Sequence, residues 1–285
     1  MIYAIRKRIN ALMISRDLGG KTMYRLELPW CEEYQVIRGA EIVNKFKSEL
    51  EYLSFVRRME LVEKVEKQAD GFKVITRAGE EMLARAVIIA TGTRQQRLEV
   101  PGEKEFMMRG LCYSAVSYAP LFIDRKAIVI GNGELALRSV GELAMVARHV
   151  HLVGVVRDQL NTPLGKKLKA ADNVSILEDY KVVEVRGNRY ADRILVKSPQ
   201  GKEEEITADG MFVELGLVPN SGMVAGLVEL DGQERIKIDC FARTNIPGIF
   251  AAGDVTNTYA EQVLVAVGEG AKAALSAYEY LLPRL

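Results

Sequence analysis

The sequence is poor in the residues that most often carry nucleophilic or metal chemistry. Its three cysteines, Cys31, Cys112 and Cys240, lie far apart and form no Cys-x-x-Cys pair. That pattern indicates neither a disulfide framework nor a zinc site, and we expect a reducing, cytoplasmic setting. The only two histidines, His149 and His151, stand at the start of an expected strand, so a Ser-His or Cys-His catalytic system is not indicated.

Excess charge and long apolar runs are also missing. Lys and Arg number 39 against 38 Asp and Glu, a net charge of +1, which gives no electrostatic case for a nucleic-acid partner or an anionic membrane. No apolar run approaches the roughly 18 residues of a membrane span, and the apolar stretch 11–14 is too short for a secretory signal. Apolar residues at 48% and a length of 285 instead suit a globular protein of two domains.

The first half of the chain alternates helix and strand patterns. Residues 2–8 have helical spacing and lead into an apolar run that reads as a strand. Residues 40–56 predict an amphipathic helix, and a β-meander with two short strands and then a strongly apolar, buried strand follow. The turns that separate these elements are expected at Gly19-Gly20, Asp70-Gly71, Ala78-Gly79 and Thr91-Gly92.

The second half repeats this order with a glycine loop at its start. A compact buried strand at 126–130 is followed by a Gly-rich turn, a helix and a strand from 149. Further strands are predicted at 174–177, 181–185, 193–198 and 211–215. Near the end, a strand closes on Gly253-Asp254 and a long helix is expected from 261 to 282.

The loop Gly131-Asn132-Gly133-Glu134-Leu135-Ala136 has the form Gly-x-Gly-x-x-Ala between a strand and a helix. In a dinucleotide site the first glycine permits the tight turn, the second lets a pyrophosphate approach, and the small third residue lets helix and strand pack closely. A glycine turn without a ligand is the alternative. Arg157 could meet a phosphate and Asp158 a ribose, or the two are a solvated charge pair.

A set of ordered motifs makes the chain resemble the low-molecular-weight thioredoxin reductase family over essentially its whole length. The motifs are Gly19-Gly20-Lys21, Ala90-Thr91-Gly92, Gly131-x-Gly133-x-x-Ala136, Gly216 with Pro219-Asn220, and Ala252-Gly253-Asp254 followed by Glu261-Gln262-Val263.

The resemblance implies an α/β fold of two Rossmann-like dinucleotide-binding domains, each a three-layer ββα arrangement. The NAD(P)H domain, 113–245, would be inserted into an FAD domain made of 1–112 and 246–285, and the protein would form a homodimer. Asp254 would hydrogen-bond the ribityl or phosphate region of FAD, and the last helix would begin beside the isoalloxazine.

The cofactor-binding residues that follow from the resemblance form two sets. Those for FAD are Gly19, Gly20, Lys21, Ala90, Thr91, Gly92, Gly253, Asp254, Glu261, Gln262 and Val263. Those for NAD(P)H are Gly131, Gly133, Glu134, Ala136, Arg157 and Gly216, and no metal site is expected.

One departure from the family concerns the N-terminal end. Family members begin with a strand and a Gly-x-Gly-x-x-Gly loop, whereas Met1–Ala4 here falls within the helix that follows that loop. Either the sequence is truncated by about twenty residues, which we favour because the other FAD motifs are present, or the FAD pyrophosphate cradle has been lost. Ser15-Arg16 also replaces the acid expected after the next strand.

A second departure concerns thiol chemistry. Ser114 and Ser117 occupy the positions of the family's redox Cys-x-x-Cys, and serine forms no disulfide. We therefore expect an oxidoreductase that passes hydride from NAD(P)H to flavin and on to a non-dithiol acceptor, a small molecule or a redox protein. The alternatives are a non-catalytic nucleotide-binding scaffold, and thiol chemistry through Cys112, whose simpler role is core packing.

Overall fold

The computed structural model describes residues 1–24, 26–34, 44–48 and 56–284. By its internal contacts the chain divides into two compact units, which we call the terminal unit and the central unit. The terminal unit is Met1–Met23, Ile37–Arg94 and Val218–Leu285; the central unit is Tyr24–Val36 and Gln95–Leu217. The chain passes between them at 23/24 and 36/37, and again within β9 (Thr93–Gln95) and β18 (Leu217–Pro219).

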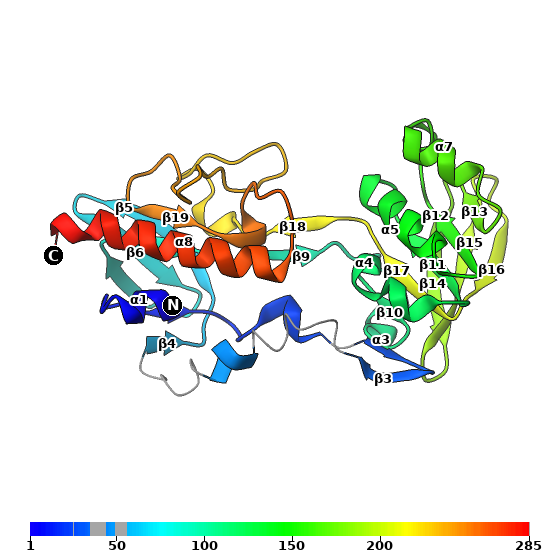
Figure 1. Ribbon diagram of the computed structural model, residues 1–285, viewed down its shortest axis with the longest axis horizontal. Helices are drawn as coiled ribbons and strands as arrows, with labels where there is room; N and C mark the ends of the chain where they lie inside the picture. Colours follow the sequence, from blue (N-terminus) through cyan, green and yellow to red (C-terminus); the bar gives the residue numbers. More distant parts are fainter. Residues whose placement is uncertain (25, 35–43, 49–55, 285) are drawn as a thin grey trace. The chain divides into compact units, whose positions relative to one another are not determined.

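The centre of the central unit is a five-stranded parallel sheet in the order β10-β17-β11-β12-β13 (Figure 1). Its strands are β10 (Leu111–Cys112), β11 (Lys126–Ile130), β12 (His149–Val153), β13 (Val174–Leu177) and β17 (Gly210–Val213). Apolar runs on β11 and β17 fit this position, because a central parallel strand is buried on both faces.

Two layers cover the sheet of the central unit. Ala127 and Val129 of β11 pack into one hydrophobic cluster with helix α5 (Glu134–Ala144), while Ile128 and Ile130 pack into another with the antiparallel sheet β14-β15-β16. This alternation follows from the twofold period of a strand and gives the expected three-layer ββα arrangement. Each fully buried apolar side chain on α5 contributes about 1.5–3 kcal/mol.

The other elements of the central unit are short. They are β2 (Leu26–Leu28), β3 (Cys31–Tyr34), α3 (Glu103–Phe106), α4 (Ala115–Tyr118), η3 (Ala119–Phe122), α6 (Arg157–Leu160), α7 (Pro163–Lys169), β14 (Lys181–Gly187), β15 (Ala191–Lys197) and β16 (Glu203–Thr207).

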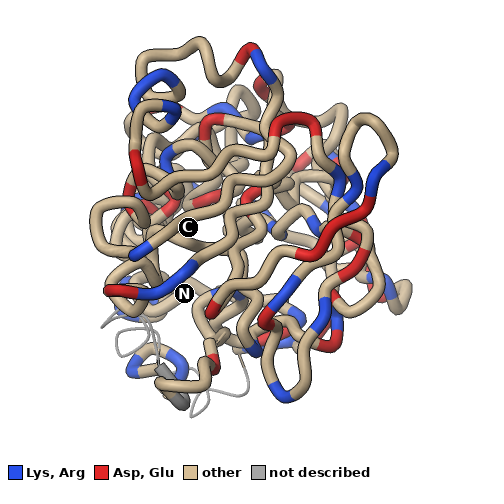
Figure 2. Tube along the Cα trace, turned by 90° about the vertical axis from the view of Figure 1, so that its right-hand side faces the viewer, with Lys and Arg blue, Asp and Glu red and all other residues tan. Residues whose placement is uncertain are grey.

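In the antiparallel sheet β14-β15-β16, strand β16 is the one that the sequence pattern does not predict. Its residues Glu203, Glu204 and Glu205 form an acidic run that reads as a solvated loop. In the sheet, β16 pairs antiparallel with β15, so that Glu203 stands opposite Lys197, and Arg186 of β14 lies 3.2 Å from Glu205. Figure 2 shows this acidic run among basic residues. Cross-strand charge pairs thus replace the apolar alternation that usually marks a strand.

The terminal unit joins both ends of the chain around short sheets. Strands β8 and β19 pair in parallel, β1 and β4 pair in parallel, and β5-β6-β7 form an antiparallel sheet. Its elements are α1 (Ile2–Arg6), β1 (Met13–Ile14), η1 (Gly20–Met23), β4 (Arg57–Arg58), β5 (Val62–Gln68), β6 (Gly71–Thr76), β7 (Glu81–Ala84), β8 (Val87–Ile89), η4 (Gly222–Val224), β19 (Ile249–Ala251), η5 (Gly253–Val255), α8 (Val263–Leu281) and η6 (Leu282–Arg284).

Helix α8 lies along β19, as Figure 1 shows. Phe250 and Ala252 pack against Ala273 and Ala277 on the helix, where small side chains allow a close approach. On the other side of β19, Ile249 joins a cluster that includes residues of β5 and β6. Strand β19 is therefore the central layer of this unit.

The sequence patterns located most of the longer strands and helices, and the fold class is confirmed. The Asp70-Gly71 turn joins β5 to β6, Ala78-Gly79 separates β6 from β7, and the last helix lies within the expected 261–282. Of the helix expected over 40–56, residues 44–48 are helical, and 40–43 and 49–55 lie outside the described residues.

The compact units do not divide at the expected domain boundaries of 112/113 and 245/246. Residues 95–112 belong to the central unit because β10 pairs with β17, and residues 218–245 belong to the terminal unit because Val224, Val228 and Ile236 pack with Ile249. The assignment of one cofactor to each domain stays a prediction.

Candidate functional site

The glycine loop of the central unit connects β11 to α5, as its pattern indicates. A Cβ added at Gly131 would lie 2.4 Å from the carbonyl oxygen of Glu214 and 2.8 Å from the Cβ of Ala136, so only glycine fits there. A Cβ at Gly133 would meet no atom of the described residues within 4 Å, which leaves that side of the loop open to a ligand. The two glycines therefore have different roles, one in packing and one in access.

Helix α5 begins at this loop without a side-chain cap. Gly133 is its N-cap residue and makes no capping hydrogen bond, so the first N–H groups of an eleven-residue helix face outward at its positive end. Such an end binds phosphate groups without further residues. A pocket of about 290 Å³ adjoins it, lined by Glu134, Leu137, Gln159, Thr162, Pro163 and Leu164. These features fit a phosphate group at the start of the helix, with a hollow beside it for part of a nucleotide.

Arg157 lies after the end of β12, as expected, and is held by an acid. Its Nε donates a hydrogen bond to Oε1 of Glu178 at 2.7 Å, and this contact raises the pKa of Arg157. Gly154 before it has φ +88°, and Val155 is buried. Gly216, with φ +117°, lies elsewhere in the unit, where its carbonyl accepts the N–H of Gln96.

Glu214 is a functional candidate that sequence reasoning missed. It directly follows β17 and is only 4% exposed, and its Oε1 accepts the N–H of Ala115 at 2.7 Å and the hydroxyl of Ser139 at 3.0 Å. Burial raises the pKa of Glu214 to about 7, against the opposing effect of these two hydrogen bonds. The available signal was a lone carboxylate in an otherwise apolar stretch, Met211–Leu215.

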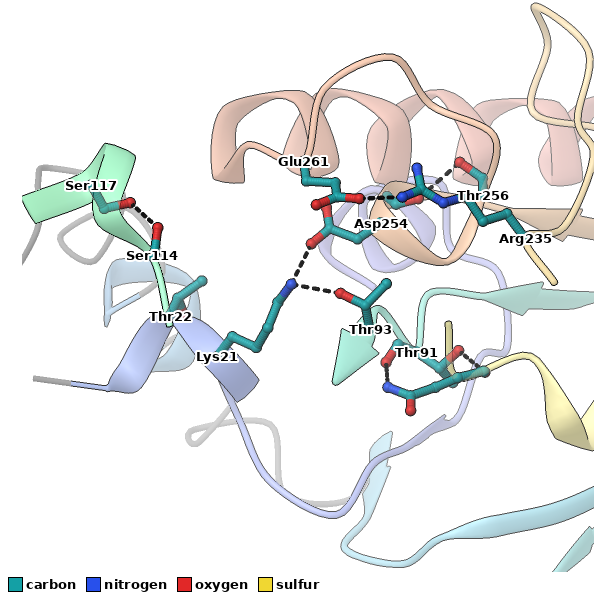
Figure 3. Close-up of polar contacts among 12 residues, drawn as sticks. Lys21, Thr22, Thr91, Thr93, Ser114, Ser117, Arg235, Asp254, Thr256 and Glu261 are labelled. Atoms are coloured by element: carbon teal, nitrogen blue, oxygen red, sulfur yellow. Dashed lines mark hydrogen bonds and ion pairs between the residues drawn. The ribbon is translucent and has the colours of Figure 1, made fainter. Parts of the chain in front are cut away.

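The two serines at the expected redox positions touch each other. Ser114 donates its hydroxyl hydrogen to Oγ of Ser117 at 2.8 Å, across the first turn of α4 (Figure 3). Glu214 holds the same turn through Ala115. Cys112, two residues before Ser114, is fully buried, and burial raises its thiol pKa. That thiol is a packing group, because reactive thiols are exposed and have a lowered pKa.

In the terminal unit, three distant segments bring polar side chains together. Lys21 of η1 donates to Oδ2 of Asp254 at 2.9 Å and to the hydroxyl of Thr93 at 2.6 Å (Figure 3). Asp254 follows Gly253, whose φ is +74° and whose N–H donates to Glu269. The side chains of Lys21 and Asp254 are 28% and 15% exposed, so the pair is reachable from one side.

The other residues expected near FAD lie at two places in the same unit. Thr91 and Asn220 exchange two hydrogen bonds, and the carbonyl of Gly92, with φ +62°, accepts the N–H of Asn220. Ala90 and Thr91 are exposed. At the start of α8, Glu261 pairs with Arg235 at 2.5 Å and Gln262 is an N-cap residue without a side-chain bond.

The turn at Gly19 and Gly20 is present. Their φ values are +106° and +52°, and the N–H of Gly20 donates to Asp17. Lys21 is thereby directed at Asp254 from the end of a fixed turn. The carboxylate of Asp254, the hydroxyl of Thr93, the ammonium of Lys21 and the glycine backbone of this turn thus fit the ribityl and phosphate part of FAD. The described residues of this unit show no strand–glycine loop–helix element for its pyrophosphate.

A family model described as pyridine nucleotide-disulphide oxidoreductase matches residues 6–270. The chain belongs to this family. Its members are FAD-dependent NAD(P)H oxidoreductases, so the family's cofactors are FAD and a pyridine nucleotide.

Individual relatives agree with this assignment. An alkyl hydroperoxide reductase subunit from Pseudomonas putida is 32% identical over 292 residues, which cover 99% of this chain and 55% of that protein. NADH dehydrogenase of Bacillus subtilis is 29% identical over 284 residues, which cover 99% and 56%. The chain spans about half the length of the curated relatives it matches.

Among solved structures, thioredoxin reductase from Streptococcus pyogenes MGAS5005 is 32% identical with a TM-score of 0.85, covering 99% of this chain and 93% of that one. The thioredoxin reductase-like resemblance is thereby confirmed. Within the described residues, no helix has the length and apolar character to cross a membrane, and no cluster of three potential metal ligands is found.

Proposed function

We propose that this protein is an FAD-dependent NAD(P)H oxidoreductase whose electrons leave to an acceptor other than a dithiol. The observation that carries the acceptor class is the Ser114–Ser117 hydroxyl pair at the positions where the family resemblance places two cysteines. Bound FAD supplies hydride acceptance from the pyridine nucleotide and onward electron transfer. The acceptor classes that remain are oxygen, a quinone, a ferredoxin or another redox protein.

The three thiols of the chain support the same proposal. Cys31, Cys112 and Cys240 are all free, and none lies within five residues of Ser114 or Ser117 except the buried Cys112. A raised thiol pKa makes Cys112 a poor nucleophile at neutral pH. Thiol chemistry through Cys112 is therefore the weaker alternative.

The chain's own residues would do the work of binding and orientation. The free N–H groups at the start of α5 would hold the pyrophosphate of the pyridine nucleotide, and Gly133 would let it approach. In the terminal unit, Lys21 would fix the carboxylate of Asp254 and add a positive charge beside it. The uncapped start of α8 would favour negative charge on a group placed before it.

A non-catalytic nucleotide-binding scaffold is the second candidate. It is favoured by one feature, the Ser114–Ser117 pair, because the position that would carry the family's dithiol carries no thiol. Such a scaffold would bind a nucleotide at α5 and show no turnover.

As in other members of the resembled family, we also expect a homodimer.

The first test is the visible spectrum of the purified chain before and after incubation with FAD, followed by desalting. Retained flavin absorbance is the result expected. A chain that takes up no FAD but binds a pyridine nucleotide would favour the scaffold.

The acceptor is tested by NADH and NADPH oxidation with oxygen, a quinone, a ferredoxin and a protein disulfide. We expect turnover with one of the first three and none with the disulfide. The double variant Ser114→Cys/Ser117→Cys is the positive control and should gain disulfide reduction. Cys112→Ser is the matched thiol control and should change nothing; disulfide reduction by the unmodified chain would refute a non-dithiol acceptor.

A further inference from the structure

The charges around the pocket at α5 are unevenly distributed. The polar groups that line it are the carboxylate of Glu134, the amide of Gln159 and the hydroxyl of Thr162, and no described Lys or Arg lines it. Carboxylate and amide oxygens accept hydrogen bonds from hydroxyl groups. The side chains that line the pocket therefore add no positive charge to that of the helix N-terminus.

The segments after β12 and β13 add to this imbalance. Residues 154–158 and 178–180 carry one guanidinium, on Arg157, and three carboxylates, on Asp158, Glu178 and Asp179. The N–H of Asp179 donates to the carbonyl of Val155 at 3.0 Å, so the two segments lie side by side. At this edge of the sheet, negative charge exceeds positive charge by two.

The single cation of these two segments is already engaged. Arg157 donates to Glu178 at 2.7 Å, and Asp179 adds a further attraction. Neither of the two residues before Arg157 adds a second cation. Val155 is buried, and Val156 is the N-cap residue of α6.

In a dinucleotide-binding fold, the end of the second strand, here β12, distinguishes NAD from NADP. An acid there accepts a hydrogen bond from the ribose 2′-hydroxyl, and arginines there accommodate a 2′-phosphate. A phosphate monoester carries about −1.5 to −2 charges at neutral pH. It would have to share Arg157, whose Nε is bonded to Glu178, with that carboxylate and remain beside the carboxylates of Asp158 and Asp179.

We propose that the central unit binds the nucleotide with a free ribose 2′-hydroxyl, NADH, and discriminates against the 2′-phosphate of NADPH through the Arg157–Glu178 pair. This inference rests on the proposed function, because it assumes that the α5 site holds a pyridine nucleotide. Glu178 acts twice here: its carboxylate repels the phosphate and also offsets the charge of Arg157, the one cation of these two segments.

The test is direct binding, without flavin or turnover. ADP-ribose and its 2′-phosphorylated form are titrated calorimetrically into the full purified chain, at fixed ionic strength because screening weakens surface charge effects. We expect ADP-ribose to bind at least about tenfold more tightly, which corresponds to about 1.4 kcal/mol. Equal affinities, or tighter binding of the phosphorylated form, would overturn the inference while leaving the nucleotide site in place.

Glu178→Gln isolates the pair. It removes the negative charge, leaves the charge of Arg157 uncompensated by this residue and should improve binding of the phosphorylated ligand several-fold, with a small effect on ADP-ribose. Glu184→Gln is the matched control, since Glu184 also pairs with an arginine, Arg186, on β14 of the same unit. An equal effect of both variants would assign the preference to overall charge and overturn the role of Glu178.

The two proposals fail in different ways. If neither ligand binds at millimolar concentration, the nucleotide site itself is wrong, and the inference falls with it. If the ligands bind without preference, only the inference falls. The measured affinity ratio of the unmodified chain decides the matter even where a variant does not fold.

Discussion

The glycine loop of the central unit and the Lys21 cluster of the terminal unit are assembled in opposite ways. The loop motif needs six consecutive residues, Gly131–Ala136, which follow strand β11 and run into the first turn of α5. The cluster needs Lys21, Thr93 and Asp254, and the ion pair within it joins residues 233 positions apart. A local motif is fixed by short-range sterics, whereas a cluster of this kind exists only when the whole unit has folded.

This comparison predicts which substitutions act on folding and which act on binding. A substitution in the glycine loop should lower stability strongly where the added Cβ would contact backbone, and only weakly where it would meet open space. Substitutions in the Lys21 cluster should have an intermediate effect on stability, because water can still hydrogen-bond a partly exposed group that has lost its partner.

The largest effect is expected for Gly131→Ala. The new Cβ would lie 2.4 Å from a backbone carbonyl that cannot rotate away, so we expect a loss of about 3 kcal/mol or more in the free energy of unfolding. Gly133→Ala is the matched control, since its Cβ meets open space and should affect nucleotide binding more than stability. Urea denaturation of both variants measures the difference, and equal losses would contradict this view of the loop.

The next effect concerns pH and Glu214. Its folded pKa of about 7 exceeds the ordinary value of 4.5, so the folded state binds the proton more tightly. The stability from this group is therefore fully present below pH 4.5 and is lost as the pH rises to 7, by about 3 kcal/mol at most.

Glu214→Gln tests this expectation. Glutamine keeps an acceptor oxygen for Ala115 and Ser139 and carries no charge, so the variant should lose stability less steeply between pH 4.5 and 7. Unfolding free energies at several pH values provide the measurement. Glu184→Gln, at a half-exposed position, serves as control. Parallel pH profiles for the unmodified chain and Glu214→Gln would contradict the prediction, because they would mean that ionising this carboxyl hardly destabilises the folded state.

A smaller effect is expected in the distant cluster. Lys21→Met removes the donor of a partly buried, charge-assisted hydrogen bond and Asp254→Ala removes its acceptor, and the two changes together should show a coupling of about 1–2 kcal/mol. A double-mutant cycle in urea measures it. A coupling near zero would show that the pair is held by the fold without stabilising it. FAD uptake by the same variants reports separately on binding.

The smallest effect is expected at the start of α8. Glu261→Gln removes the ion pair with Arg235, whose two side chains are 26% and 19% exposed. We expect a loss of about 0.5–1 kcal/mol, in the upper range for surface pairs, and a decrease of this loss at high salt. Thermal unfolding at two salt concentrations measures both. A loss larger than that of Lys21→Met would reverse the order of these two effects.

Much of the fold could be predicted from the sequence because its signals are local. Strand β13 was located at its observed limits, 174–177, and β11 and α5 followed directly from the apolar run and the glycine loop. Hairpins β5-β6 and β6-β7 followed from Gly71 and Gly79 in their turns.

The site could be predicted only in part. Asp254 and Lys21 were each expected near FAD, but their ion pair was not, because no sequence pattern relates residues so far apart. Glu214 was missed because a single carboxylate after a strand normally faces solvent. Arg157 was left with two possible roles, and its partner Glu178, one strand further along the sheet, became visible only in the fold.

The Glu214 carboxylate has one more consequence, which concerns the backbone amide of Ala115. That N–H is held at 2.7 Å by a buried acceptor, and the same acceptor binds Ser139 on α5 while the Glu214 carbonyl oxygen packs against Gly131. The hydrogen-exchange rate of this one amide therefore reports on the whole junction. Exchange should slow when a nucleotide occupies the glycine loop, so that this amide is an internal sensor of binding that requires no turnover.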